Sequence, residues 1–229
     1  MSMTCRAVLL IAVAALATAS SCAREPGDAL SRPCNLDVRE DGRLFVSDFH
    51  NVRVVVFDAQ DQVVSTVGGR GFGPGELWGV GDLAALPGGG FAVINQSRAS
   101  LDDLNTPRPE IKLFDANGQE VAAFSTLLGV DVTSLPAGIA VVPDGLAITD
   151  IAHHRISLFS TKGLPKRVID RVKGGPPVDA PTGLRFRGGK LWMAEGKKHR
   201  VRALSLEGEQ LLSVGREGSE DGQMLFPHA

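Results

Sequence analysis

Short blocks of apolar residues alternate along the chain with polar turn residues. A clear block is 42–57, in which Gly42 opens an apolar run, Asp48 follows it, and Arg53 stands five positions later before a second apolar run that ends at Phe57. Apolar runs of this length, bounded by Gly, Pro, Asn and Asp, predict brief β-strands joined by tight turns. The pattern therefore predicts an all-β protein.

The block occurs four times. Its copies begin at the turn residues Gly42, Gly90, Gly145 and Gly189, and each is preceded by a start position at Pro33, Val80, Pro136 or Pro181. The start positions are 47, 56 and 45 residues apart, which is the length of a β-propeller blade. We therefore predict a β-propeller of four-stranded antiparallel blades over 33–79, 80–135, 136–180 and 181–226.

The repeated block resembles the NHL repeat of six-bladed β-propellers, from Pro33 to the end of the chain. The resemblance rests on a Pro-x-Gly start, a turn Gly before an apolar run, and an acid followed five positions later by Arg. The pairs are Asp48 with Arg53, Asp150 with Arg155 and Glu195 with Arg200. Because the pair recurs, we assign it to blade construction as a charge-assisted hydrogen bond. The second copy departs from the pattern, with Asn95 for the acid and a longer insertion over 96–110.

A Gly-rich link follows the first and the fourth copy. The links over 68–77 and 215–224 have the same Gly spacing, and the second leads to Pro227, where a fifth blade would begin. Relative to a six-bladed ring the propeller is expected to be incomplete. The sequence leaves open a truncated chain, a propeller completed by another chain, and a closed four-bladed ring. Open strand edges favour the first two, because they invite association.

The N-terminus has the form of a signal peptide over 1–21. Arg6 precedes an apolar run over 7–19 that is too short to cross a bilayer. Residues 19–22 resemble the bacterial lipoprotein box, which would place a lipid anchor on Cys22, whereas cleavage after Ala19 would leave Cys22 to pair with Cys34. Residues 22–32 read as a polar tether. We expect an exported protein, either a membrane-anchored lipoprotein or a periplasmic or extracellular one.

The charge is unevenly distributed. The chain has a formal net charge of −2, which argues against nucleic acid as its partner. Residues 162–202 nevertheless carry twelve Lys or Arg against three acids. Such a stretch suggests a basic face for a protein or an anionic envelope component, although an ordinary charged exterior has the same composition. The candidates for this face are Arg185, Arg187, Lys190, Lys197 and Lys198.

Enzymes that share the resemblance supply the alternative function. The peptidyl-hydroxyglycine amidating lyase family holds zinc through His residues, and the sugar-lactone hydrolases hold a divalent cation through acidic and Asn side chains. No set of three among the five His maps onto the first family, although His154 and His199 occupy equivalent repeat positions. The oxygens that would suit the second belong to Asp82, Asn95, Asp150 and Glu195. In the insertion, Asp102 and Asp103 are loop candidates for a cation.

The sequence contains no nucleophile elbow, phosphate loop or metalloprotease helix motif. We therefore assign no catalytic residue, metal ligand or cofactor, and Ca or Zn enters only with the metal-dependent alternative. The sequence favours an exported or lipid-anchored β-propeller that binds or scaffolds in the cell envelope. The alternative is a metal-dependent propeller lyase or hydrolase.

Overall fold

The structure is a computed structural model that describes residues 29–96, 109–126 and 134–228. Within these ranges sixteen strands form four four-stranded antiparallel sheets, and neighbours in each sheet are neighbours in the chain. This confirms the predicted all-β propeller.

Each sheet is one blade. Blade 1 contains β1 (Pro33–Val38), β2 (Leu44–Asp48), β3 (Arg53–Phe57) and β4 (Val63–Gly68). Blade 2 contains β5 (Leu83–Ala85), β6 (Phe91–Asn95), β7 (Glu110–Phe114) and β8 (Glu120–Ser125). Blade 3 contains β9 (Pro136–Val142), β10 (Gly145–Asp150), β11 (Arg155–Phe159) and β12 (Pro165–Ile169). Blade 4 contains β13 (Pro181–Arg187), β14 (Lys190–Glu195), the short 3-10 helix η1 (Gly196–Lys198), β15 (Arg200–Leu204) and β16 (Gln210–Val214).

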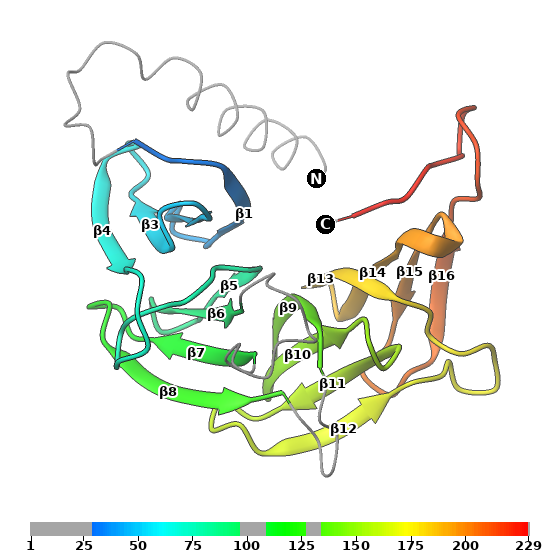
Figure 1. Cartoon of the computed structure of the whole chain (residues 1–229). Helices are drawn as coiled ribbons and strands as arrows, with labels where there is room; N and C mark the ends of the chain where they lie inside the picture. The colour runs from blue at the N-terminus through cyan, green and yellow to red at the C-terminus, as the bar shows by residue number, and fades with distance from the viewer. Residues whose placement is uncertain (1–28, 97–108, 127–133, 229) are drawn as a thin grey trace.

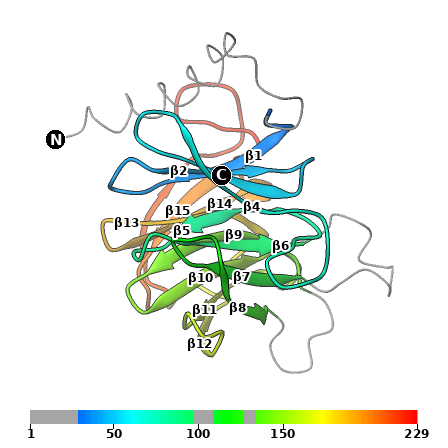
Figure 2. The same ribbon diagram turned by 90° about the vertical axis from the view of Figure 1, so that its left-hand side faces the viewer.

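The blades are arranged about a common axis (Figure 1). The first strand of each blade (β1, β5, β9 and β13) lies nearest the middle, and the fourth (β4, β8, β12 and β16) lies at the rim. A view turned by 90° shows the sheets stacked one after another (Figure 2). Loops that join first to second strands therefore gather at one end of the axis, and loops that join second to third strands gather at the other.

The apolar runs become strands that are buried on both faces. Four of the five residues are buried in β2, β3 and β11, because each of these strands lies in the middle of a blade between two packed surfaces. The rim strands differ, since β16 is exposed along its whole length and β4 buries only Val67. Burial thus explains why the middle strands carry the longest uninterrupted apolar runs.

Consecutive blades pack through apolar clusters. Between blades 1 and 2 the cluster includes Val54 and Val56 on one side and Phe91 and Phe114 on the other, with the two Phe rings stacked 4.9 Å apart. Similar clusters join blade 2 to blade 3 and blade 3 to blade 4. Among the described residues no such cluster joins blade 4 to blade 1.

At two of the four turn glycines of the repeat, Gly90 and Gly145, the neighbouring strand leaves no space for a side chain. At Gly145 the backbone has φ +145°, and a Cβ there would collide with the carbonyl oxygen of Phe159 on the neighbouring strand. A Cβ at Gly90 would collide with the carbonyl oxygen of Phe114 in the same way. Only glycine lets the second strand begin this close to the third.

The two links that share Gly spacing also share a conformation. An isolated parallel bridge joins Arg70 to Leu77 in the first link and Glu217 to Met224 in the second. The N–H of Leu77 donates to Gly69 and that of Met224 to Arg216, both at 2.9 Å. The chain therefore leaves blade 4 along the path by which it leaves blade 1. Across the described residues, no helix has the length and apolar character needed to span a bilayer.

Candidate functional site

The recurring acid and Arg form an ion pair within blades 1, 3 and 4. Each acid ends the second strand and lies opposite the Arg that begins the third. The distances between carboxylate oxygen and guanidinium nitrogen are 2.8 Å for Asp48 with Arg53, 3.2 Å for Asp150 with Arg155 and 2.5 Å for Glu195 with Arg200. Since all three acids are nearly or fully buried, these pairs stand inside the blades.

The same acids hold the chain segment that enters the blade. The carboxylates of Asp48, Asp150 and Glu195 accept the backbone N–H groups of Ser31 at 2.7 Å, Leu135 at 3.1 Å and Asp179 at 2.8 Å.

Asn95 does the corresponding work in blade 2. Its Oδ1 accepts the N–H of Trp78 at 3.0 Å, and its amide donates to Glu110 at 2.9 Å. The position therefore serves blade entry whether it carries an acid or an amide.

The histidines at repeat positions also contact links. His154 and His199 adopt φ 52°, as Val52 does in blade 1. Nδ1 of His154 accepts the N–H of Ala180 at 2.9 Å, and Nδ1 of His199 accepts that of Phe226 at 3.2 Å. Among the described residues no three His, Cys, Asp or Glu side chains are grouped so as to hold a metal ion. In particular, Asn95, Asp150 and Glu195 each serve their own blade, so they do not combine with Asp82 into one oxygen cage.

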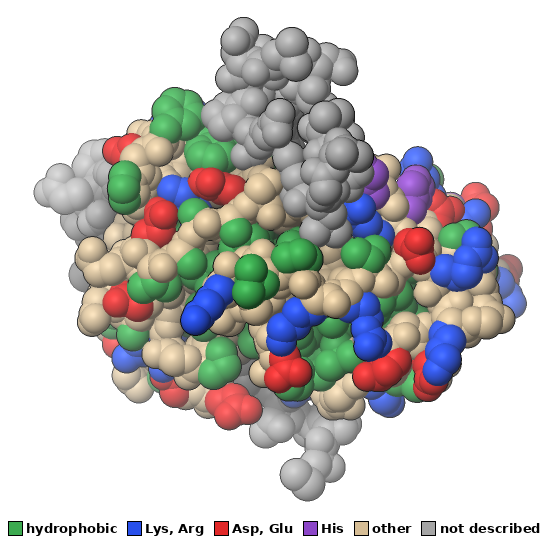
Figure 3. Space-filling view, turned by 90° about the horizontal axis from the view of Figure 1, so that it is seen from below, with side chains coloured by type: hydrophobic (Ala, Val, Ile, Leu, Met, Phe, Trp, Pro, Cys, Tyr) green, Lys and Arg blue, Asp and Glu red, His purple; other side chains and the backbone are tan. Residues whose placement is uncertain are grey.

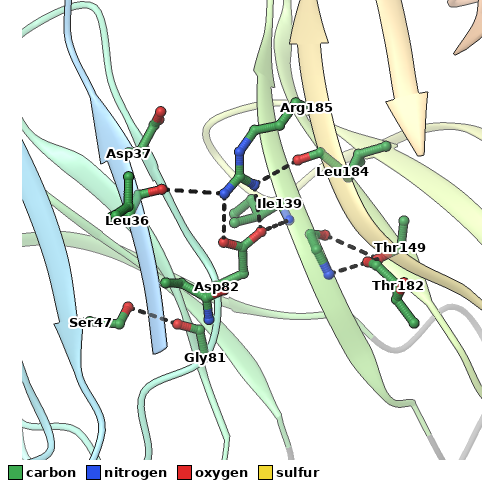
Figure 4. Close-up of polar contacts among 12 residues, drawn as sticks. Leu36, Asp37, Ser47, Gly81, Asp82, Ile139, Thr149, Thr182, Leu184 and Arg185 are labelled. Atoms are coloured by element: carbon green, nitrogen blue, oxygen red, sulfur yellow. Dashed lines mark hydrogen bonds and ion pairs between the residues drawn. The ribbon is translucent and has the colours of Figure 1, made fainter. Parts of the chain in front are cut away.

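A different pair lies at the axis, where the blades meet (Figure 4). Arg185 of β13 donates from Nη1 to Oδ2 of Asp82 at 2.8 Å and from Nη2 to Oδ1 at 3.2 Å, which makes the pair bidentate. Nη1 also donates to the carbonyl of Leu184 at 2.7 Å, and Nη2 to that of Leu36 in β1 at 3.3 Å. Oδ2 of Asp82 also accepts the N–H of Ile139 in β9, at 3.1 Å. We call Asp82 and Arg185 the axial pair, which contacts all four blades.

Asp82 is well placed for this role. It immediately precedes β5, and the corresponding positions in the Pro-x-Gly starts of blades 3 and 4 are Gly138 and Gly183. At Gly138 a Cβ would collide with the backbone of Thr182 in blade 4. Blades 3 and 4 pack backbone against backbone at this position. Blade 2 has the carboxylate of Asp82 there instead.

Burial and charge oppose one another in the axial pair. Burial raises the pKa of Asp82, while Arg185 and the N–H of Ile139 pull it back down. Burial alone would lower the pKa of Arg185, but Asp82 outweighs it and the pKa is raised. Because the carboxylate accepts two guanidinium bonds and a backbone N–H, the geometry favours the ion pair.

Hydroxyl groups add two further bonds between blades near the axis. Ser47 Oγ of blade 1 donates to the carbonyl of Gly81 in blade 2 at 2.8 Å, and Thr149 Oγ1 of blade 3 donates to that of Thr182 in blade 4 at 2.7 Å. Blades 2 and 3 are joined there by Asp82 itself. Polar side chains therefore connect every consecutive pair of blades near the axis.

A pocket of about 780 Å³ opens at the axis beside this pair. It lies at the end where first and second strands are joined, and residues of all four blades line it: 37–41 of blade 1, 84–88 of blade 2, 139–141 of blade 3, and Arg185 and Phe186 of blade 4. Its size falls within the range of small-molecule sites. We call it the axial pocket.

The charges of the axial pocket do not balance. Arg39 pairs with Asp41, and this contact holds the pKa of Asp41 below its usual value. Arg185 is engaged by Asp82. Asp37 and Glu40 therefore remain in excess, and Asp37 is fixed by the N–H groups of Val38 and Ala85 at 3.0 and 2.8 Å. The pocket is net acidic, with apolar walls.

Solved structures resemble this fold, whereas no family model and no curated protein matches the sequence. A catalytically inactive variant of virginiamycin B lyase from Staphylococcus aureus, solved with quinupristin, is 13% identical with a TM-score of 0.58, over 81% of this chain and 56% of that one. A streptogramin B lyase is 14% identical with a TM-score of 0.58, over 84% and 60%. A protein of unknown function from Bacteroides caccae is 13% identical with a TM-score of 0.56, over 85% and 64%.

These similarities establish the propeller fold alone. The chain spans 56–64% of the length of those three structures, so their activities do not transfer with the fold.

The candidates for a basic face are not brought together. Arg185 turns to the axis, and Arg187 pairs opposite Lys190 at the pocket end of blade 4. Lys197 and Lys198 lie in η1, at the other end of β14. Seen from the side of β8 and β12, Lys and Arg side chains are interspersed with acidic and apolar ones (Figure 3). Cys22, Asp102 and Asp103 lie outside the described residues.

The axial pair could not be found from the repeat. The sequence offered Asp82 as one of four loose oxygen ligands, and Arg185 as a solvent-facing cation. The signal that separates them from the other charges is their departure from the repeat, since Asp82 replaces the Gly of Pro-x-Gly.

Proposed function

We propose that this chain is an exported β-propeller binding module of NHL-like blades that takes a small, partly apolar cation in the axial pocket. The observation that carries the proposal is the excess of Asp37 and Glu40 in a pocket lined by every blade. A cationic group would meet these carboxylates, and its apolar part would lie against Leu86, Val141 and Phe186. Small-molecule sites combine apolar walls with a few fixed polar groups in this manner.

The other charged residues described above stabilise the propeller. The repeated acids hold blade entries, and the axial pair fastens the blades around the pocket. Export is supported by the signal-like residues 1–21 and a lipid anchor by the box ending at Cys22. A lipid anchor would hold the protein in the cell envelope, whereas export alone would leave it periplasmic or extracellular.

Calorimetric titration tests the ligand class. The probes are 4-phenylbutylammonium and 4-phenylbutyrate, which share an apolar body and differ in the sign of charge. We expect the ammonium probe to bind and the carboxylate probe to bind at least about 10-fold more weakly, because an acidic site favours a cation by a kcal/mol or more. Equal binding of both probes, or tighter binding of the carboxylate, would contradict the proposal.

Variants of the two acidic residues test whether the probe binds in the axial pocket. Asp37→Asn keeps an oxygen for the N–H of Ala85 while removing the charge, and Glu40→Gln removes the other excess charge. Each variant should raise the dissociation constant of the ammonium probe several-fold. The control is Glu207→Gln, which removes an exposed acid from a turn at the rim of blade 4 and should leave binding unchanged.

A further inference from the structure

The first strand of every blade is an edge strand, and its unpaired edge faces the axis (Figure 1). In an antiparallel sheet the backbone N–H and C=O groups of alternate residues point towards the neighbouring strand, and those of the residues between them point away. Leu36, Ile139 and Leu184 occupy equivalent positions, because each pairs with the residue two before the repeated acid. The axial pair bonds a backbone group of each of these three residues. At this position the backbone groups therefore point to the axis.

Two residues further along each strand, the same edge reaches the axial pocket. The residues at this level come one from each blade and all line the pocket: Val38, Ala85, Val141 and Phe186. Since the direction of the backbone groups repeats every two residues, their N–H groups also point to the axis. Two of the N–H groups show this directly, because those of Val38 and Ala85 donate to the carboxylate of Asp37 at 3.0 and 2.8 Å.

The four N–H groups at this level are not equally satisfied. On the side of blades 1 and 2, the carboxylate of Asp37 accepts one N–H from each blade. On the side of blades 3 and 4, the N–H groups of Val141 and Phe186 have no acceptor on the protein among the described residues. Backbone N–H groups require an acceptor, and Asp37 shows that the oxygens of one planar group suit a pair of them. The pocket thus offers two donors to a ligand oxygen.

These donors and the acids in excess belong to different sides of the axial pocket. Asp37 and Glu40 lie on blade 1, whereas Val141 and Phe186 lie on blades 3 and 4. Arg185, which also lines the pocket, stands next to Phe186 on the donor side. One side of the pocket therefore favours a positive group, and the other favours an acceptor oxygen. Because the pocket as a whole is net acidic, a neutral carbonyl suits the donor side better than a second carboxylate.

We propose that the ligand of the axial pocket is the amino-terminal end of a peptide whose first residue is apolar. This inference rests on the proposed function and names its ligand class. The terminal ammonium would meet Asp37 and Glu40. A peptide carbonyl would accept the N–H groups of Val141 and Phe186, and the apolar side chain would pack against Leu86. Capture of a terminal amine together with backbone hydrogen bonds is a recurring form of peptide recognition.

Calorimetric titration with L-phenylalanyl-glycinamide tests the ligand class, with 4-phenylbutylammonium as the matched cation that lacks a carbonyl. The dipeptide amide should bind about 10-fold more tightly, the effect of two added hydrogen bonds. Its N-acetylated form, which lacks the cation, should bind at least about 10-fold more weakly than the free form.

The outcomes separate this inference from the proposed function. If 4-phenylbutylammonium binds and the dipeptide amide binds no more tightly, the peptide assignment fails and the proposed function stands. If neither cation binds, both fail. Free L-phenylalanine that binds as tightly as the dipeptide amide would overturn the assignment to a peptide, because its carboxylate would then suit the site as well as a neutral carbonyl.

Val141→Pro tests the donor, because proline lacks the N–H and is tolerated on an edge strand where that N–H faces away from the sheet. Since one of two donors is lost, the advantage of the dipeptide amide over 4-phenylbutylammonium should fall by about 3-fold. The matched variant Val141→Ala keeps the N–H, so it should weaken both probes alike and preserve their ratio. An unchanged ratio in Val141→Pro would overturn the assigned donor.

Nuclear magnetic resonance of the unaltered protein tests the same bond should Val141→Pro not fold. The amide proton signals of Val141 and Phe186 should move downfield with the dipeptide amide, and by a smaller amount with 4-phenylbutylammonium. Equal shifts with both probes would contradict a hydrogen bond to the peptide carbonyl.

Discussion

Breaking the axial pair should loosen the whole propeller, because Asp82 and Arg185 together contact all four blades. The perturbation is a double-mutant cycle of Asp82→Asn, Arg185→Met and the combined variant. The side chain of Asp82 is 1% exposed and that of Arg185 is 39% exposed. Arg185→Met therefore leaves a buried carboxylate, whereas Asp82→Asn leaves a partly exposed guanidinium. The two variants should lower the free energy of unfolding by different amounts.

The magnitudes follow from that difference. Removing one partner of a fully buried ion pair costs about 3–5 kcal/mol. Arg185→Met leaves Asp82 buried without its counter-charge and should cost about 3 kcal/mol. Asp82→Asn leaves a cation that water still reaches, so the cost should fall to about 2 kcal/mol. With a coupling of about 2 kcal/mol, the double variant should lose only about 3 kcal/mol.

The assay is urea unfolding followed by tryptophan fluorescence, since Trp192 lies opposite Arg185 in the sheet. The control is Lys190→Met, which removes an exposed cation at the start of β14 and should change the free energy of unfolding by less than about 0.5 kcal/mol. A coupling below about 0.3 kcal/mol, the level expected of independent sites, would refute the account of the axial pair.

The same variant makes a pH prediction. Burial raises the pKa of Asp82 in the folded protein, and losing Arg185 should raise it further, since Arg185 opposes that shift. An acid whose pKa is raised by folding destabilises the protein as pH rises through the interval between its unfolded and folded values. The deficit of Arg185→Met should therefore be smaller at about pH 5 than at about pH 8. A deficit that does not change with pH would show that Asp82 is not left as a buried charge.

Two predictions concern the repeat. Asp48→Asn should cost about 2 kcal/mol, because it removes the counter-charge of Arg53 but leaves an amide that can still accept the entering N–H as Asn95 does. Asp48→Ala should cost about 4 kcal/mol, because alanine also leaves the buried N–H unpaired; equal costs by urea unfolding would contradict this. Gly145→Ala should cost at least about 3 kcal/mol, since the new Cβ meets the carbonyl of Phe159. Gly189→Ala, at φ +73° with no atom within 4 Å, should cost only about 1 kcal/mol in thermal unfolding, and the reverse order would contradict the turn geometry.

The fold could be predicted because its information is local and repeated. Each copy carries its own turn Gly, its own apolar runs and its own acid and Arg five positions apart, so Asp48 and Arg53 are joined by a single hairpin. Comparing copies was enough to interpret them. Even the irregular Asn95 occupies the repeat position, and the structure gives it the same role at the entry to its blade.

The axial pair and pocket depend on how the blades are turned about the axis, which no local pattern encodes. Asp82 and Arg185 are 103 residues apart, and they meet because β5 and β13 both lie at the axis. The sequence places Arg185 among the candidates for a basic outer face, although β13 is the innermost strand of its blade. The first strand of each blade lies at the axis. A charged side chain on this strand can therefore face the axis, as Arg185 does, instead of the exterior.

The most direct test of the proposed function is to locate the ammonium probe by nuclear magnetic resonance. Titration of 4-phenylbutylammonium into isotope-labelled protein should shift the signals of Leu86, Val141 and Phe186, with the largest changes at the axial pocket. The His-bearing turns at the opposite end of the axis should not respond. Shifts concentrated at His154 and His199, with none in the pocket, would contradict the account.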